Sequence, residues 1–138
     1  MSVESNKAQS LAWYEALNSP NWEQAVEPLF VGVFAQYHDW FMESHRLFRR
    51  AFPDYHATIV HAVAEGDTVI LLLKVTGTHS AEYPEGELKG IAPTGKKLEW
   101  YEASVTVYQD GVPTDIQLII DGVTRLQQLG VLPVEQGM

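Results

Sequence analysis

A histidine and an aspartate stand next to strongly apolar segments, and imidazole and carboxyl groups are side chains that commonly transfer protons in enzymes. The histidine is His79, which ends the run TVILLLKVTGTH at residues 68–79. Strand alternation places it on the same face as Val69, Leu71 and Leu73. We expect His79 either in a pocket, where it can donate to a carbonyl oxygen, or at a strand end, hydrogen-bonded to the following loop.

The aspartate is Asp121, which follows the segment TDIQLII at residues 114–120. Alternation puts Gln117, Ile119 and Asp121 on one face, an unusual combination unless the polar groups meet water, a partner or a ligand. In an apolar pocket, desolvation would raise the pKa of this carboxyl towards the range useful for acid/base catalysis. Alternatively, Asp121 caps a helix that begins at DGVTRLQQL, and on the outer surface such a cap would contradict a catalytic role.

A further histidine, His45, lies on a helical stripe with Phe41, Phe48 and Phe52, where a histidine is more often a core residue than a catalyst. The five histidines form no HxH or HExxH pair, and the chain has no cysteine. No glycine-rich phosphate loop is present either. The sequence therefore predicts neither a metal site nor a bound cofactor.

Helical patterns come first along the chain and strand patterns second, which indicates an α+β fold rather than repeated βαβ units. We expect helices at residues 6–20, 21–30, 40–52 and 121–130, and strands at 31–37, 55–64, 68–79, 97–109 and 114–120. Asp39 is a candidate N-cap, and Pro53 ends the helix before it. A curved antiparallel sheet packed on the N-terminal helices would enclose a cavity at one end.

The composition narrows the class of partner. The 138 residues fit one domain spanning 1–138, and a net charge of −9 repels both nucleic acid and anionic lipid. The longest apolar run is too short to cross a bilayer, and the first residues lack the pattern of a secretory signal. The sequence predicts a cytoplasmic protein that binds an apolar small molecule, without nucleic-acid or membrane partners.

Four segments together resemble the SnoaL-like polyketide cyclases of the NTF2-like superfamily. They are AFPDYHATIVHAVAEGDTV, VTGTHSAEY, GIAPTGKKLEW and DGVTRLQQLG, and the similarity covers roughly residues 40–133. The resemblance implies a cone-shaped α+β barrel with a deep hydrophobic pocket and no cofactor. It also implies general acid/base chemistry that closes a ring on a polyketide ester by an aldol-type reaction.

The resemblance assigns roles to particular residues. Asp121 matches the acid/base aspartate of the family by its spacing to the QLG motif, and His79 matches the histidine of its GTH motif. A polar pocket residue of the family on the third helix falls near Ser44 or His45. Independently of the resemblance, Gln117 shares the face of Asp121, where it either orients a substrate oxygen or bonds across the sheet or to solvent. The expected ligand-binding residues are His45, Gln117, Phe41, Leu17 and Trp13, with Leu17 at a position where some members carry an aromatic hydroxyl.

Two departures from the family pattern lie next to the expected site. The segment QLII precedes Asp121 where many members carry a tryptophan and charged residues, and the loop at residues 80–92 is longer and contains YPEGELK. Alternatives to cyclisation are an isomerase or dehydratase on the same scaffold, or a non-catalytic binding or association module. Epoxide opening is disfavoured, because it would need an inward arginine between carboxylates and no arginine obviously points inward.

A homodimer or a higher homo-oligomer is the expected assembly, formed through an exposed sheet face. The segment at residues 98–108 has a mixed face that suits this role. That face carries Trp100, Ser104, Thr106 and Tyr108.

Overall fold

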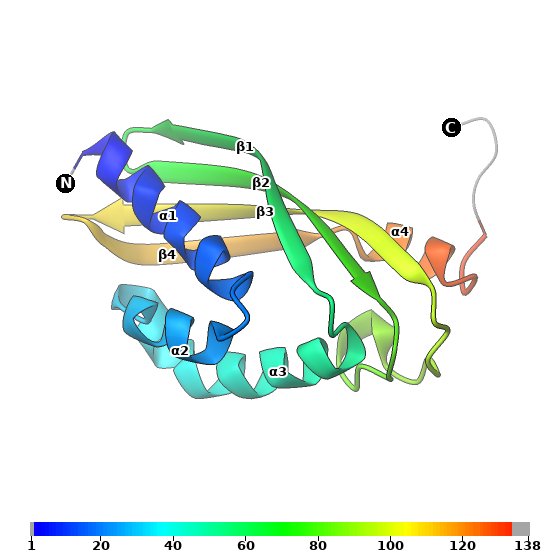
Figure 1. Cartoon of the computed structure of the whole chain (residues 1–138). Coiled ribbons are helices and arrows are strands. Elements are labelled where there is room, and N and C mark those ends of the chain that lie inside the picture. Colours follow the sequence, from blue (N-terminus) through cyan, green and yellow to red (C-terminus); the bar gives the residue numbers. More distant parts are fainter. Residues whose placement is uncertain (1, 134–138) are drawn as a thin grey trace.

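The computed structural model describes residues 2–133 and contains a four-stranded antiparallel sheet with helices packed against it (Figure 1). The strands neighbour one another in chain order, so each connection joins adjacent antiparallel strands. They are β1 (His56–Glu65), β2 (Thr68–Thr78), β3 (Lys97–Gln109) and β4 (Val112–Ile120). The α+β class predicted from the sequence is confirmed.

The inward face of the sheet follows the alternation expected for β2. Val69, Leu71, Leu73 and Val75 are all buried, while the intervening side chains are partly or fully exposed. Irregular register occurs between β1 and β2 at residues 59–61 and between β3 and β4 at residues 107–108. Such bulges bend a strand and increase its twist, which helps the sheet to curve around the helices.

Helix α1 (Val3–Leu17) crosses the inward face of the sheet, as Figure 1 shows in blue. It begins with a capping box between Ser2 and Ser5. The side chain of Asn18 then donates to the carbonyl of Ala57 at 2.7 Å and accepts from its N–H at 2.8 Å. These two bonds hold the end of α1 against the first residues of β1.

Helices α2 (Trp22–Val26) and α3 (His38–Ala51) follow, separated by two short 3₁₀ segments, η1 (Glu27–Leu29) and η2 (Gly32–Tyr37). In Figure 1, α3 lies below the sheet and next to α2. Asp39 lies in its first turn rather than at its N-cap, which is Tyr37. Among residues 2–133, no helix combines the length and the apolar character that crossing a bilayer requires.

Two expectations about strands are wrong. The segment VGVFAQY forms η2 instead of a strand, and Gly32 at its start has φ +58°, which a strand does not use. The face of β3 that was expected to form a dimer interface is buried inside the molecule, where Trp100 and Tyr108 are almost fully covered. This face points inward because α1 and α3 need an apolar surface to pack against.

The loop between β2 and β3 is closed at its base by backbone pairing. The N–H of His79 donates to the carbonyl of Lys96 at 2.9 Å, and the N–H of Gly95 donates to the carbonyl of His79 at 2.8 Å. Asp54 adds a second tie, because it accepts hydrogen bonds from the N–H and hydroxyl of Thr78, each at 2.7 Å. The FPD, GTH and PTG segments are therefore neighbours that fix where the loop leaves the sheet.

We predict that Gly77→Ala destabilises the protein. A Cβ at Gly77 would lie 3.0 Å from Cβ and Cδ1 of Phe52, which is fully buried. Overpacking of this kind costs about 1–3 kcal/mol of unfolding free energy, measured by urea denaturation. Without the clash, the substitution would instead stabilise the protein by about 0.4–1 kcal/mol through the unfolded chain, and that result would contradict the packing.

Candidate functional site

A cavity of about 370 Å³ lies between the helices and the inward face of the sheet. Its size falls within the range of small-molecule sites. Helices α1 and α3 supply one wall, the β2–β3 loop a second, and β3, β4 and α4 (Gly122–Gln128) the remainder. The lining residues are Trp13, Tyr14, Leu17, Trp40, Phe41, Ser44, His45, Phe48, Tyr55, Tyr83, Glu85, Gly86, Glu87, Glu102, Leu118, Ile120 and Arg125.

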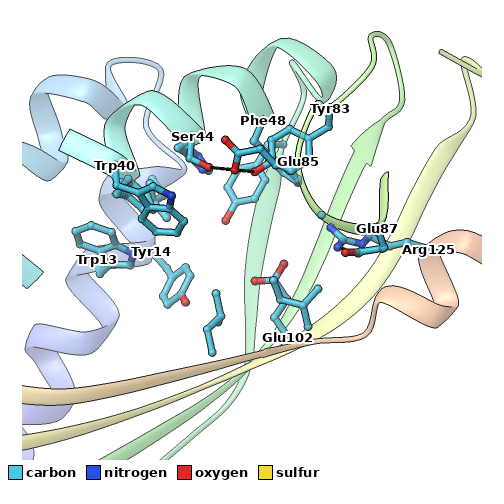
Figure 2. A pocket seen from close by; sticks show the side chains of 17 residues that line it. Trp13, Tyr14, Trp40, Ser44, Phe48, Tyr83, Glu85, Glu87, Glu102 and Arg125 are labelled. Carbon is cyan, nitrogen blue, oxygen red and sulfur yellow. Dashed lines mark hydrogen bonds and ion pairs between the residues drawn. The ribbon is translucent and has the colours of Figure 1, made fainter. Parts of the chain in front are cut away.

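Glu102 is the carboxyl group on the sheet side of the cavity (Figure 2). It lies on the inward face of β3 and accepts a hydrogen bond from the indole N–H of Trp100 at 2.8 Å. Burial raises the pKa of this carboxyl above its usual range, although the Trp100 hydrogen bond and the guanidinium of Arg125 act in the opposite direction. A raised pKa makes this carboxylate a stronger base, which suits it to accept a proton and return it.

Arg125 is buried although it carries a charge, with only 5% of its surface exposed. Its guanidinium donates to a carboxylate oxygen of Glu87 and lies over the ring of Trp100, 4.9 Å from the ring centroid. Gly122 makes room for this pair, because a Cβ there would approach Oε1 of Glu87 to 2.8 Å. The expectation that no arginine points inward is therefore wrong.

The loop insertion YPEGELK forms part of the cavity wall. Within it, the short 3₁₀ segment η3 (Gly86–Leu88) turns the chain back, and Leu88 is fully buried. The hydroxyls of Ser44 and Tyr83 donate to Oε2 of Glu85, at 2.9 and 3.2 Å. Figure 2 shows these three side chains together along one side of the cavity. The loop is thus held to α3 through Glu85 and to α4 through Glu87.

Tyr14 brings a phenol hydroxyl into the same cavity from α1. Its burial, followed by the negative charge of Glu102, raises the pKa of the phenol well above its usual value. Tyr14 therefore remains a neutral hydrogen-bond donor at physiological pH.

His45 lines the cavity from α3 within the aromatic stripe expected from the sequence. Its ring stacks on Phe41, with centroids 5.2 Å apart, and on Phe48, with centroids 5.9 Å apart. Nε2 is buried and has no hydrogen-bond partner among residues 2–133. Burial, with a smaller contribution from the charge of Arg49, lowers the pKa of His45 to about 3, so the imidazole is neutral.

Three other expected ligand-binding residues, Trp13, Leu17 and Phe41, also line the cavity. Gln117 does not, because it is exposed on the opposite face of β4. The β3–β4 register explains this, since Glu102 pairs with Ile120 and partners across a sheet share a face. The inward face of β4 is therefore the one that carries Leu118 and Ile120.

The structure also corrects the expected position of Asp121. Its side chain is exposed and caps α4, accepting from the N–H of Thr124 at 3.1 Å and from its hydroxyl at 2.6 Å. These hydrogen bonds lower its pKa, whereas a pocket position was expected to raise it. Asp121 therefore stands outside the cavity, as the helix-cap interpretation predicted.

His79 likewise lies outside the cavity, fully buried at the base of the loop. The N–H of Thr94 donates to Nδ1 of His79 at 3.2 Å, which leaves the proton of the neutral ring on Nε2. Its ring packs beside Phe52, with centroids 5.6 Å apart, and burial lowers its pKa. In this position His79 holds the loop in place and does not reach a ligand in the cavity.

Four polar residues of the cavity are not among the site residues predicted from the sequence: Glu102, Arg125, Tyr83 and Glu85. Alternation in β3 places Glu102 on the same face as Trp100, which is the kind of signal that drew attention to Asp121. Arg125, Tyr83 and Glu85 carry no comparable signal, because their positions depend on how a loop and a short helix fold over the sheet. Among residues 2–133, no cluster of three or more His, Cys, Asp or Glu side chains could hold a metal ion.

Comparisons with known proteins agree with this geometry. A family model described as SnoaL-like polyketide cyclase matches residues 9–129. AclR of Streptomyces galilaeus, a proposed hydroxylase, superposes with a TM-score of 0.72 at 26% identity, covering 99% of this chain and 87% of its own. A SnoaL-like polyketide cyclase of Agrobacterium tumefaciens gives 0.68 at 16% identity, with 94% and 100% covered.

IdmH of Streptomyces antibioticus, a proposed polyketide cyclase, gives a TM-score of 0.68 at 23% identity, covering 91% of this chain and 99% of its own. These similarities extend over nearly the whole chain and support the NTF2-like fold. A comparison with curated proteins finds no match.

We predict that His45→Phe removes a pH dependence of stability. A base whose pKa is lowered on folding contributes stability above its unfolded pKa of about 6.5, and that contribution is lost as pH falls towards 3. Urea denaturation between pH 7 and 4 measures this effect. Below pH 6.5, the free energy of unfolding of the wild type should fall by roughly 1.4 kcal/mol per pH unit relative to that of the variant. Parallel curves for the two proteins would contradict a buried, neutral His45.

Proposed function

The chain belongs to the SnoaL-like polyketide cyclase family. We propose that it catalyses cofactor-independent acid/base chemistry on an apolar carbonyl or ester compound, with Glu102 as the proton-transfer group. The observation that carries the proposal is a carboxyl with a raised pKa in a largely apolar cavity. In this proposal Glu102 takes the acid/base role that the sequence suggests for Asp121.

The proposed reaction is an aldol-type ring closure. The Glu102 carboxylate removes a proton from a carbon next to a carbonyl, and the neutral phenol of Tyr14 donates a hydrogen bond to the enolate oxygen. The enolate carbon then forms a bond to a second carbonyl carbon of the same molecule. The protonated Glu102 returns its proton to the resulting alkoxide, so no proton or electron is gained or lost overall.

The aromatic walls would promote this closure by holding a flexible substrate folded. Trp13, Phe41, Phe48 and Tyr55 line the cavity and offer flat apolar surfaces on which a polyketide-like chain can pack. Holding the enolate carbon against the second carbonyl carbon lowers the entropy cost of forming the bond between them. Exclusion of water by the same walls would keep the carboxyl of Glu102 desolvated.

We predict that Glu102→Gln abolishes proton transfer. Deuterium exchange at the α-carbons of phenylbutanone, followed by NMR, isolates the proposed first step. The variant should exchange about 10²–10⁴-fold more slowly than the wild type, which is the usual contribution of a general acid/base group. The fall should occur while the free energy of unfolding stays at or above the wild-type value, because a neutral amide replaces a costly buried carboxyl.

Asp121→Asn is the matched comparison in the same assay. We expect its exchange rate to stay within about twofold of the wild type, since Asp121 is exposed outside the cavity and contributes no group that reaches the substrate. Loss of exchange in Asp121→Asn together with full activity in Glu102→Gln would overturn the proposal. Binding of phenylbutanone without exchange in the wild type would favour the non-catalytic binding module.

Epoxide opening is a second candidate, because the cavity does contain an arginine between carboxyl groups. Arg125 is bonded to Glu87 and is close enough to Glu102 for its charge to lower that pKa. Styrene oxide distinguishes the two reactions, since its hydrolysis to a diol requires no enolate. Glu102-dependent diol formation without exchange of phenylbutanone would assign the chain to this second reaction.

We also propose that two copies associate through the outward face of the sheet. Exposed or half-buried apolar side chains are adjacent there across all four strands, and Ile119 and Val63 are 63% and 58% exposed. The remaining members are Ile70, Leu72, Ala103 and Val105. A continuous apolar surface of this kind commonly marks an interface, and a second copy offers the same surface in a two-fold arrangement.

We predict that light scattering coupled to size exclusion finds a dimer at tens of micromolar protein. Ile119→Lys should shift it to the monomer, because each copy would bury an ammonium group without an opposite charge in the interface. A wild-type monomer over this range of concentration would contradict the proposal. The cytoplasmic location stays a prediction from the sequence.

A further inference from the structure

The charged groups of the cavity do not cancel one another. Glu85, Glu87 and Glu102 line it together with a single cationic side chain, Arg125. Arg125 already donates to Glu87 and stacks on Trp100. Glu85 forms no salt bridge with any of residues 2–133, so one carboxylate at the cavity has no cation opposite it.

The hydrogen bonds of Glu85 leave one of its oxygens available. Ser44 and Tyr83, both neutral donors, converge on Oε2 at 2.9 and 3.2 Å. No group among the described residues donates to Oε1. The two hydroxyls orient the carboxylate without neutralising its charge, which leaves Oε1 able to accept from a ligand.

An aromatic ring lines the same cavity on the same side as this carboxylate. Trp40 lies one helical turn before Ser44 on the same face of α3, and both residues line the cavity. Its side chain is 64% exposed, which is unusual for the largest apolar side chain and places the ring at the mouth. Figure 2 shows Trp40 and Ser44 on the same side, well apart from Glu87 and Arg125.

We propose that the cavity recognises a ligand with a protonated amine or quaternary ammonium group, bound between Glu85 and the ring of Trp40. Carboxylates pair with cations, and an indole face is the best aromatic partner for an ammonium group. The apolar part of the ligand would extend into the cavity towards Glu102. This inference rests on the proposed function only in taking the cavity as the active site.

Ligands of other charge fit the wall less well. An anion would face the excess of carboxylates, and the single guanidinium is already paired. A neutral ligand that filled the mouth would remove water from the Glu85 carboxylate and offer no opposite charge in its place. The cost of this lost hydration would weaken binding of such a ligand. A cation removes that cost, and the net charge of −9 on the chain favours its approach.

Isothermal titration with phenylbutylamine, phenylbutanol and phenylbutanoate tests the proposal directly. At pH 7 these probes share one apolar skeleton and are cationic, neutral and anionic. We expect the amine to bind at least about tenfold more tightly than the alcohol, and the alcohol more tightly than the carboxylate. An alcohol that binds as tightly as the amine would overturn the proposal.

Glu85→Gln separates recognition from support of the loop. The glutamine carbonyl still accepts from Ser44 and Tyr83, so the loop stays attached, but the negative charge is gone. Amine affinity should fall about tenfold, whereas alcohol affinity should change by less than about twofold. Equal losses for both probes would assign Glu85 to the loop alone and overturn the proposal.

Glu43→Gln is the matched control, because Glu43 is exposed on α3 outside the cavity and its substitution changes the net charge equally. It should leave amine binding unchanged; a loss equal to that of Glu85→Gln would show a general charge effect and contradict the site. Repeating the titration in Glu102→Gln keeps the two proposals apart. The Glu102→Gln variant should still bind the amine more tightly than the alcohol. A wild type that shows Glu102-dependent exchange but does not prefer the amine would overturn the cation site and leave the proposed function standing.

Discussion

The anchoring of one loop on two helices completes the wall of the cavity. Glu85 and Tyr83 hold the loop to α3 through Ser44, and Glu87 holds it to α4 through Arg125. At the base, backbone bonds between His79 and residues 95–96 fix where the loop leaves the sheet. Without these contacts the cavity would be open to water, and the environment that raises the pKa of Glu102 would be lost.

The same polar contacts give the cavity two unlike ends. Near β3 and α4, the Arg125–Glu87 pair and the Trp100 hydrogen bond surround the carboxyl of Glu102. Near α3, the carboxylate of Glu85 and the exposed ring of Trp40 line the same side of the cavity, and Glu85 has no opposite charge among the residues described. Proton transfer at one end and cation recognition at the other are consistent with one elongated substrate whose apolar middle packs on the aromatic walls.

Strand alternation and family motifs predicted most of the fold, because burial of one sheet face requires an apolar side chain at every second position of β2. The site was harder to predict, since it depends on which face of β4 turns inward and how the loop folds over the sheet. Alternation grouped Gln117 with Asp121, but pairing of Glu102 with Ile120 turns the opposite face inward. His79 was correctly placed on the apolar face of β2, yet it lies beyond the end of the cavity, where it supports the loop.

The most direct test of the central claim is the pKa of the Glu102 carboxyl, measured by NMR titration of protein with ¹³C-labelled glutamate side chains. Comparison with Glu102→Gln assigns the resonance. Because burial is the largest influence on this carboxyl, we expect a midpoint above the ordinary glutamate value of about 4.3. A midpoint at or below that value would mean that Glu102 is a solvated or ion-paired carboxylate, and it would contradict a role in proton transfer.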